Sequence, residues 1–260
     1  MKEKRSWQQR IISILICLGA CWLFYAGVMN WMAWHYAREV SRSHQNLGIV
    51  PTPLRETTTE ELKGPRIGKF GFSFQVPWEE IDHDRTTETV ALMSFKEGVG
   101  LAIFNPDTVP DGAKTMRGST ARQFATMTSV FGAQALSSNY ELMVAEVRAT
   151  PADVKWWAGR SRNVRSIILL TDKSLDLRDA TAIHEIRSGT MRGFQFGDPG
   201  VLPCWVNLDL FDAADRHYRI WITGKDKSAL CVTQAQINGL VASIRPLPSG
   251  PVSMAPSNGD

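Results

Sequence analysis

Histidine and carboxylate residues gather at two places along the chain, and these residue types are suited to metal binding or acid–base chemistry. The first place is Trp78–Asp84, where Asp82, His83 and Asp84 follow two glutamates. Carboxylates bind hard divalent cations and imidazole binds zinc, so this segment is a candidate metal site. Its spacing matches no metal-binding loop, and we favour the alternative of a solvated acidic turn.

The second place is the segment before His217, which contains Asp212 and Asp215. An aspartate beside a histidine can orient a general base, so Asp215 and His217 are a candidate catalytic pair. No serine nucleophile can be assigned to it from the sequence. The alternative is turn chemistry, because aspartate side chains bond to their own backbone in tight turns. His184 and Glu185 are neighbours in a predicted strand, where they point to opposite faces.

Basic and aromatic residues form two candidate partner surfaces. A predicted helix places Trp156, Arg162 and Arg165 where they can stack on sugars or bases, or rest on lipid headgroups. The alternative is an ordinary amphipathic helix with Trp157 toward the core. In Arg192–Gly200, Phe194 and Phe196 lie among glycines that serve either a bulge and a turn or the close approach of a partner.

Motif searches assign no catalytic residue, no metal and no cofactor. The sequence contains no phosphate-binding loop, dinucleotide fingerprint, zinc-protease motif, serine-hydrolase elbow or Cys-x-x-Cys. The net charge is +3, and residues 1–10 alone carry four basic and one acidic residue, which also sum to +3. The remainder is therefore neutral and offers no electrostatic basis for binding nucleic acid.

An apolar segment, Ile11–Trp34, follows this basic stub and contains no charged side chain. A helix of this length spans a hydrocarbon core of about 30 Å, and Trp31, Trp34 and Tyr36 suit a membrane interface. More basic residues precede the segment than follow it closely, which predicts a single-pass signal anchor in the inner (cytoplasmic) membrane with the N-terminus inside.

Two alternatives apply to the same segment. A cleaved signal peptide has a shorter apolar core and a small-residue cleavage site. Leu18–Cys21 resembles a lipoprotein box with Cys21 as the lipidated residue, although the apolar residues that follow it differ from the usual polar tether.

Composition divides the rest of the chain into a linker, one domain and a tail. Residues 35–66 are polar and contain prolines and a threonine run, residues 67–246 have the size of one extracytoplasmic (periplasmic) domain, and residues 247–260 have the composition of a disordered tail. Cys204 and Cys231 fall in the domain, where an oxidising compartment permits a disulfide. We expect them at the same end of a hairpin, and the alternative is two buried thiols.

Hydrophobic periodicity predicts three strands, three helices, four strands and a closing helix. The predicted strands are 70–76, 88–95, 99–104, 181–188, 191–197 and the two arms of the hairpin 205–223. The predicted helices start near Met116, Asn139 and Thr150, and the closing helix covers about 233–243. Hairpins without βαβ alternation predict an α+β fold, in which one antiparallel sheet is flanked by helices after an N-terminal transmembrane helix.

The predicted order of strands and helices resembles the PsbP-like fold, an antiparallel sheet flanked by helices, and three segments carry the resemblance. They are Gly71–Trp78, the hairpin Trp205–Thr223 and the final Ala242–Pro246. The resemblance implies a mostly non-enzymatic group of small domains that assist the assembly or function of larger complexes. It transfers no functional residue to this chain.

These observations lead to three hypotheses of function. The first is a non-catalytic membrane-anchored protein whose outer domain binds an envelope protein or assists a complex. The second is an anchored hydrolase or metal-dependent enzyme that uses His83 with Asp82 and Asp84, or His217 with Asp215. The third is a carbohydrate or cell-wall binding module that uses Trp156.

Overall fold

A computed structural model describes most of the chain and divides it into two compact units that alternate along the sequence. The described residues are 2–43, 45–54, 58–109, 112–155, 157, 160–177, 180–224 and 231–247. A helical unit comprises Met1–Pro51 and Asp111–Thr181, and a sheet unit comprises Thr52–Pro110 and Ala182–Asp260. The residues that the sequence analysis placed in one domain are thus divided between the two units.

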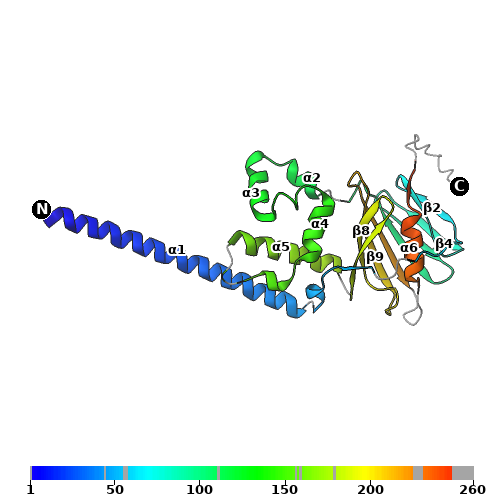
Figure 1. Ribbon diagram of the computed structural model, residues 1–260, viewed down its shortest axis with the longest axis horizontal. Coiled ribbons are helices and arrows are strands. Elements are labelled where there is room, and N and C mark those ends of the chain that lie inside the picture. Colours follow the sequence, from blue (N-terminus) through cyan, green and yellow to red (C-terminus); the bar gives the residue numbers. More distant parts are fainter. Residues whose placement is uncertain are drawn as a thin grey trace, which may run out of the picture. The chain divides into compact units, whose positions relative to one another are not determined.

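Five α-helices and two short 3₁₀ turns are described in the helical unit. They are α1 (Lys2–Ser43), η1 (Gln45–Gly48), α2 (Gly112–Arg117), α3 (Ala121–Phe131), α4 (Asn139–Arg148), η2 (Pro151–Asp153) and α5 (Arg160–Leu177). Helix α5 contacts α1, α3 and α4, and Figure 1 shows α1 running past α5 as a long single rod. Helix α5 is therefore the central element of this unit.

Local capping sets the limits of α3 and α4. Thr120 forms a capping box with Gln123, so the helix predicted from Met116 is divided at this point into α2 and α3. Helix α3 ends at Gly132, whose φ of +84° suits glycine. Ser138 accepts a hydrogen bond from Glu141 N and caps α4, which begins at Asn139 as predicted.

Helix α5 differs from its prediction in its start and in its buried face. Residues Pro151–Asp153 form only a 3₁₀ turn, and α5 begins at Arg160. The prediction that Trp157 faces the core is wrong, because Trp157 is 67% exposed. The residues that are buried instead include Asn163 and Lys173. Both are tolerated inside because the fold supplies hydrogen-bond partners.

Lys173 has no solvent exposure and donates to backbone carbonyls from two separate segments. Its Nζ lies 3.2 and 2.6 Å from the carbonyl oxygens of Leu47 and Ile49, and 2.9 and 2.8 Å from those of Val147 and Ala149. The latter two lie at the C-terminal end of α4, where unpaired carbonyls attract a cation. Lys173 thereby ties α5 to α4 and to the chain that follows α1.

The predicted transmembrane helix, Ile11–Trp34, lies within α1 and is corrected by the structure. Among the described residues, no helix combines the length and the apolar character needed to cross a membrane. In the described part of α1, polar Asn30 and the amphipathic tryptophans and tyrosines lower the mean hydropathy. The side chains of residues 1–16, and with them the first part of the predicted segment, lie outside the described residues.

The sheet unit contains two sheets rather than the single antiparallel sheet that the sequence predicts. The larger has eight strands in the order β1-β7-β8-β9-β10-β6-β5-β4, and the smaller has three in the order β11-β3-β2. Strand β1 pairs with β7 in parallel, which makes the larger sheet mixed. In chain order the strands are β1 (Thr52–Pro53), β2 (Arg66–Lys69), β3 (Phe72–Gln75), β4 (Ile81–Thr86), β5 (Val90–Phe95), β6 (Val99–Phe104), β7 (Ile183–Ser188), β8 (Met191–Phe196), β9 (Trp205–Phe211), β10 (His217–Gly224) and β11 (Arg245–Pro246).

The core of this unit is built from both sheets and from helix α6 (Gln234–Ala242). Phe72 and Phe74 of the small sheet are fully buried, and the Phe72 ring meets Tyr218 of β10 edge-on at 4.8 Å. Phe70 was predicted to start this strand, but it lies in the β2–β3 turn with φ of 51°, beside Gly71 at φ of 78°. The two positive φ values are those of a tight hairpin turn.

Candidate functional site

A polar cluster in the sheet unit surrounds Asp209, a fully buried carboxylate on β9. Asp209 Oδ1 lies 2.6 Å from His217 Nε2 and 2.7 Å from Arg219 Nε, and Oδ2 accepts a hydrogen bond of 2.9 Å from Asn207 Nδ2. Three donors on two strands therefore share one carboxylate. We call these four residues the Asp209 cluster.

Strand register explains why these residues meet. Asp209 lies directly opposite Arg219 across the β9–β10 ladder, and Phe211 lies opposite His217. Side chains alternate between faces along a strand, so Asn207 and Asp209 share one face with Arg219. The His217 ring stacks on Phe211 with centroids 4.5 Å apart, which fixes its plane beside the carboxylate.

Electrostatics hold Asp209 in its ionised form. Burial alone would raise the pKa of this carboxyl, but the Arg219 charge and the hydrogen bond and charge of His217 hold its pKa below the ordinary value. Both carboxylate oxygens are occupied, and Asn207 Oδ1 is buried with no hydrogen-bond partner among the described residues. The cluster holds two strands together and orients one imidazole.

The same geometry limits the catalytic hypothesis. An aspartate that orients a histidine is one part of a general-base system, and the other part is a group from which the second ring nitrogen takes a proton. In the part of the chain that the structure describes, no hydroxyl or thiol hydrogen-bonds to His217 Nδ1.

The predicted partner of His217 takes another role. Asp215 lies in the β9–β10 turn with φ of 65°, and its N–H donates to Asp212 O at 3.0 Å. Asp212 accepts from the backbone N–H groups of Ala214 and Arg216, as expected for turn chemistry, and from the Tyr218 hydroxyl at 2.9 Å. The structure thus pairs His217 with Asp209 instead of Asp215.

The candidate metal ligands lie on β4, a strand that the sequence analysis treated as a loop. Asp82, His83 and Asp84 are all exposed, and the side chain of His83 is 81% exposed. Asp84 forms an ion pair of 2.8 Å with Lys69. Within the described ranges, no group of three or more His, Cys, Asp or Glu residues is placed to hold a metal ion.

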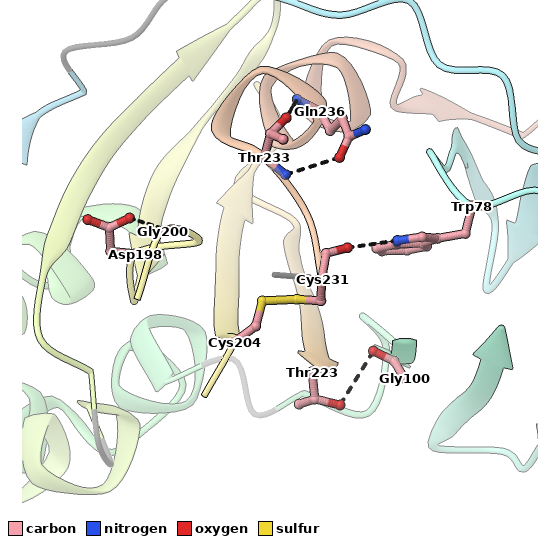
Figure 2. Close-up of a disulfide and its surroundings, with 9 residues drawn as sticks. All are labelled: Trp78, Gly100, Asp198, Gly200, Cys204, Thr223, Cys231, Thr233 and Gln236. Atoms are coloured by element: carbon pink, nitrogen blue, oxygen red, sulfur yellow. Dashed lines mark hydrogen bonds between the residues drawn. A yellow bond between two sulfur atoms is a disulfide. The ribbon is translucent and has the colours of Figure 1, made fainter. Parts of the chain in front are cut away.

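Cys204 and Cys231 form a disulfide at the end of the β9–β10 hairpin, with Cα atoms 5.9 Å apart. Figure 2 shows this bond between the start of β9 and the segment that leads to α6. The Trp78 indole N–H donates to Cys231 O at 2.9 Å, and the Thr233 capping box begins α6 just beyond. The disulfide thus fixes α6 to the larger sheet.

A second candidate site is a pocket of about 730 Å³ within the helical unit, between α3, α4 and α5. Its basic lining residues are Arg148, Lys155, Arg162 and Arg165, and its acidic ones are Glu141 and Asp153. We call it the basic pocket. Arg162 and Arg165 were candidate partner residues from the sequence, and the pocket now gives them a shared location.

The remaining candidate partner residues are Trp156, Phe194 and Phe196. Trp156 lies outside the described residues. Phe194 and Phe196 are fully buried on β8, so neither ring is presented to a partner. Gly193 allows close backbone approach there, since a Cβ at this position would lie 2.0 Å from Asp209 O. Asn207, Asp209 and Arg219 were not among the residues predicted from the sequence, and their regular alternation on paired strands was the available signal.

No protein-family model, curated protein or solved structure with which we compared the chain matches it.

Proposed function

We propose that this protein is a non-catalytic accessory protein that contacts a lipid bilayer through α1 and assists a protein complex of the cell envelope. The observation that carries the proposal is a set of exposed large apolar side chains on α1. Trp22 is 68% and Phe24 75% exposed, and the others in the set are Leu18, Leu23, Tyr25, Val28, Trp31, Met32 and Tyr36.

This exposure is unfavourable in water and favourable against lipid. Burying one large apolar side chain is worth about 1.5–3 kcal/mol, so the set as a whole gains strongly from an apolar surrounding. Exposed apolar patches of this kind mark interaction surfaces. Tryptophan and tyrosine are the residues most enriched at the boundary between lipid and water, which favours a bilayer as the surface in contact.

The location that we propose is the extracytoplasmic face of the cytoplasmic membrane. The Cys204–Cys231 disulfide supports this side, because disulfides persist in oxidising compartments. The assisting role follows from the resemblance to the PsbP-like fold, and the Asp209 cluster, whose carboxylate oxygens are fully occupied, supports a structural use of its histidine.

Flotation with phosphatidylcholine vesicles tests the lipid contact. We expect the full chain to float with the vesicles, and Leu23→Glu with Phe24→Glu to reduce the bound fraction at least tenfold, since each change places a charge among acyl chains. Leu175→Glu is the matched control, because Leu175 is 69% exposed on α5 of the same unit. A wild-type chain that stays at the bottom of the gradient would refute the lipid contact.

Crosslinking in native membranes tests the accessory role. We expect one recurrent envelope partner to be recovered with the wild-type chain, and the same partner to be lost when the folded units are denatured before crosslinking. Recovery of random neighbours in both samples would refute it.

A further inference from the structure

We propose that the basic pocket binds the phosphate headgroup of an anionic lipid. This inference rests on the proposed contact between α1 and a bilayer, and it assigns that contact a second, polar component. The site lies wholly within the helical unit, so its geometry depends on no other part of the chain.

The charges in the pocket favour an anion. Four basic and two acidic residues line it, which leaves an excess of two positive charges. The acids already have partners: Glu141 Oε2 accepts from Gln134 Nε2 at 3.1 Å, and Asp153 Oδ2 accepts from Thr150 N at 2.7 Å. A lipid phosphate can therefore approach Arg162 and Arg165 without displacing them from these acids.

Arg162 and Arg165 are the two guanidinium groups available to such an anion. Neither has a hydrogen-bond or ion-pair partner among the described residues, and both line the pocket. Arg165 Nη1 lies beside Gly132, since a Cβ there would be 3.9 Å away. A guanidinium group binds phosphate through two parallel hydrogen bonds, a geometry that a lysine ammonium cannot reproduce.

The position of the pocket along α1 identifies lipid as the source of the phosphate. Asn163 of α5 donates to Asn30 of α1 at 3.2 Å and to Lys155 O at 2.8 Å, which places Arg162 next to this level of α1. Phe24 lies six residues before Asn30, or about 9 Å along the helix axis. If the apolar side chains near Phe24 contact acyl chains, the pocket lies at the level of the headgroups.

The lining is suited to an amphipathic ligand. Phe131, Val144 and Leu169 contribute apolar surface beside the arginines. A lipid offers both parts, a phosphate for the guanidinium groups and acyl-chain methylenes for the apolar wall. An acidic peptide is the competing occupant, and the experiment below separates the two.

Vesicle partition of the full chain tests the inference. The vesicles are phosphatidylcholine alone and phosphatidylcholine with about 30 mol% phosphatidylglycerol. We expect Arg165→Gln to weaken partition to the anionic vesicles about tenfold or more, because a charge-assisted bidentate contact is lost. Arg165→Lys keeps the charge and should restore only part of the binding.

Two further variants separate a pocket from diffuse attraction. Arg122→Gln removes the same charge from an exposed position on α3 outside the pocket, and it should change partition about twofold at most. Ala133→Phe fills the pocket without a charge change, and it should weaken anionic partition as Arg165→Gln does. Equal losses in Arg122→Gln and Arg165→Gln, with none in Ala133→Phe, would overturn the inference.

Soluble competitors identify the occupant. Glycerol 1-phosphate should displace the wild-type chain from anionic vesicles and should have little effect on Arg165→Gln. A glutamate-rich peptide that competes more strongly than glycerol 1-phosphate would assign the pocket to an acidic protein and overturn the lipid inference. Inorganic phosphate that binds the chain while both vesicle types bind it equally would overturn it as well.

The two proposals fail in different ways. A wild-type chain that does not bind vesicles of pure phosphatidylcholine contradicts the lipid contact of α1. Phosphate binding by Arg165 is then still measured by the shift of its side-chain resonances on addition of glycerol 1-phosphate. Retained binding to both vesicle types with no effect of Arg165→Gln contradicts the pocket only.

Discussion

Asp209 and Lys173 are charged side chains without solvent exposure, and the fold stabilises them in different ways. Asp209 is paired with two cationic or potentially cationic side chains, whereas Lys173 is surrounded by backbone carbonyls. Burial of a charge is costly unless it is paired and hydrogen-bonded. Both residues are therefore sites at which one substitution should have a large effect on stability.

Replacement of Asp209 by asparagine should lower the free energy of unfolding by about 3–5 kcal/mol at neutral pH, because Arg219 and His217 then lose their buried counter-charge. The folded-state pKa of Asp209 is depressed, so its stabilisation is present above the ordinary carboxyl pKa of about 3.9 and is lost as the pH falls through the folded-state pKa. The measurement is urea denaturation at pH 7 and pH 3.

Asp107→Asn is the control for this variant. Asp107 forms an ion pair of 3.0 Å with Arg216, but its side chain is 75% exposed, so its loss should cost no more than about 1 kcal/mol. An Asp209→Asn variant that is as stable as the control would contradict the structural role of the cluster. So would an effect that stays constant from pH 7 to pH 3.

Lys173 should make stability depend on pH on the alkaline side. Burial lowers the pKa of this lysine to about 8, while that of an unfolded lysine is about 10.4. Between these values the unfolded chain binds more protons, so the free energy of unfolding rises with pH, by at most about 1.4 kcal/mol per pH unit. The burial cost is thus fully present below pH 8 and is relieved above it.

Lys173→Met should remove this alkaline rise and destabilise the helical unit, since four carbonyls lose their donor. The wild type and the variant are compared by denaturation at pH 7, 8 and 9. Tyr218, whose pKa burial raises to about 12, opposes the rise only above its ordinary pKa of about 10. Parallel pH profiles in the two proteins would contradict the prediction.

Strand β9 lies close against β8 at the position where β8 carries a glycine. A Cβ at Gly193 would lie 2.0 Å from Asp209 O and 2.8 Å from Leu210 Cα, so any side chain must displace backbone. Gly193 also lies directly opposite Leu210 in the ladder. Packing at this point therefore decides both the strand spacing and the position of Asp209.

Gly193→Ala should lower the free energy of unfolding by about 3 kcal/mol, the upper part of the usual range for overpacking. Gly68→Ala on β2 is the control, because its Cβ would meet only Leu247 Cδ1 at 3.4 Å. Thermal denaturation followed by circular dichroism measures both. Equal stability of the two variants would show that the β8–β9 contact relaxes without cost.

Most elements of the sheet unit could be predicted because their patterns are local. Phe72 and Phe74 alternate with polar residues, and the pairs β5–β6, β7–β8 and β9–β10 follow turn signals. Strand β4 was missed because all six of its residues are exposed and carry no hydrophobic alternation. The buried face of α5 was missed because Asn163 and Lys173 are polar, and their burial depends on partners that are distant in sequence.

At the scale of the whole chain, the two units alternate along the sequence, and the disulfide belongs to the sheet unit alone. It closes a loop with a sequence separation of 27 residues. In the loop-entropy model, this restriction of the unfolded chain stabilises the folded state by about 3.5 kcal/mol. Its loss should therefore weaken one unit selectively.

Cys204→Ser with Cys231→Ser should speed amide hydrogen exchange in β9 and β10 and leave α4 and α5 unchanged. Cys17→Ser with Cys21→Ser is the matched control, because both cysteines are unpaired and exposed on α1. Exchange measured by mass spectrometry reports the two units separately. An equal loss of protection in α4 and α5 would show that the two units unfold together.

The candidate sites were only partly predictable. Arg162 and Arg165 were singled out because basic residues recur on one predicted helix, and the structure places both in the basic pocket. His217 was singled out by its nearby aspartates, but its partner is Asp209, eight residues earlier on the paired strand. Hairpin register decides that choice, and register depends on the turn and on the packing of both faces.

The sequence by itself determined the features that depend on neighbouring residues: the α+β composition, the neutral charge beyond residue 10, the hairpins, the start of α4 near Asn139 and the nearness of Cys204 to Cys231. Only the tertiary structure decided that there are two sheets, that α1 packs against α5, and that Asp209 and Lys173 are buried with their partners. The physical reason is that a buried polar group is tolerated only when distant segments supply its hydrogen bonds, and no local pattern records where those segments meet.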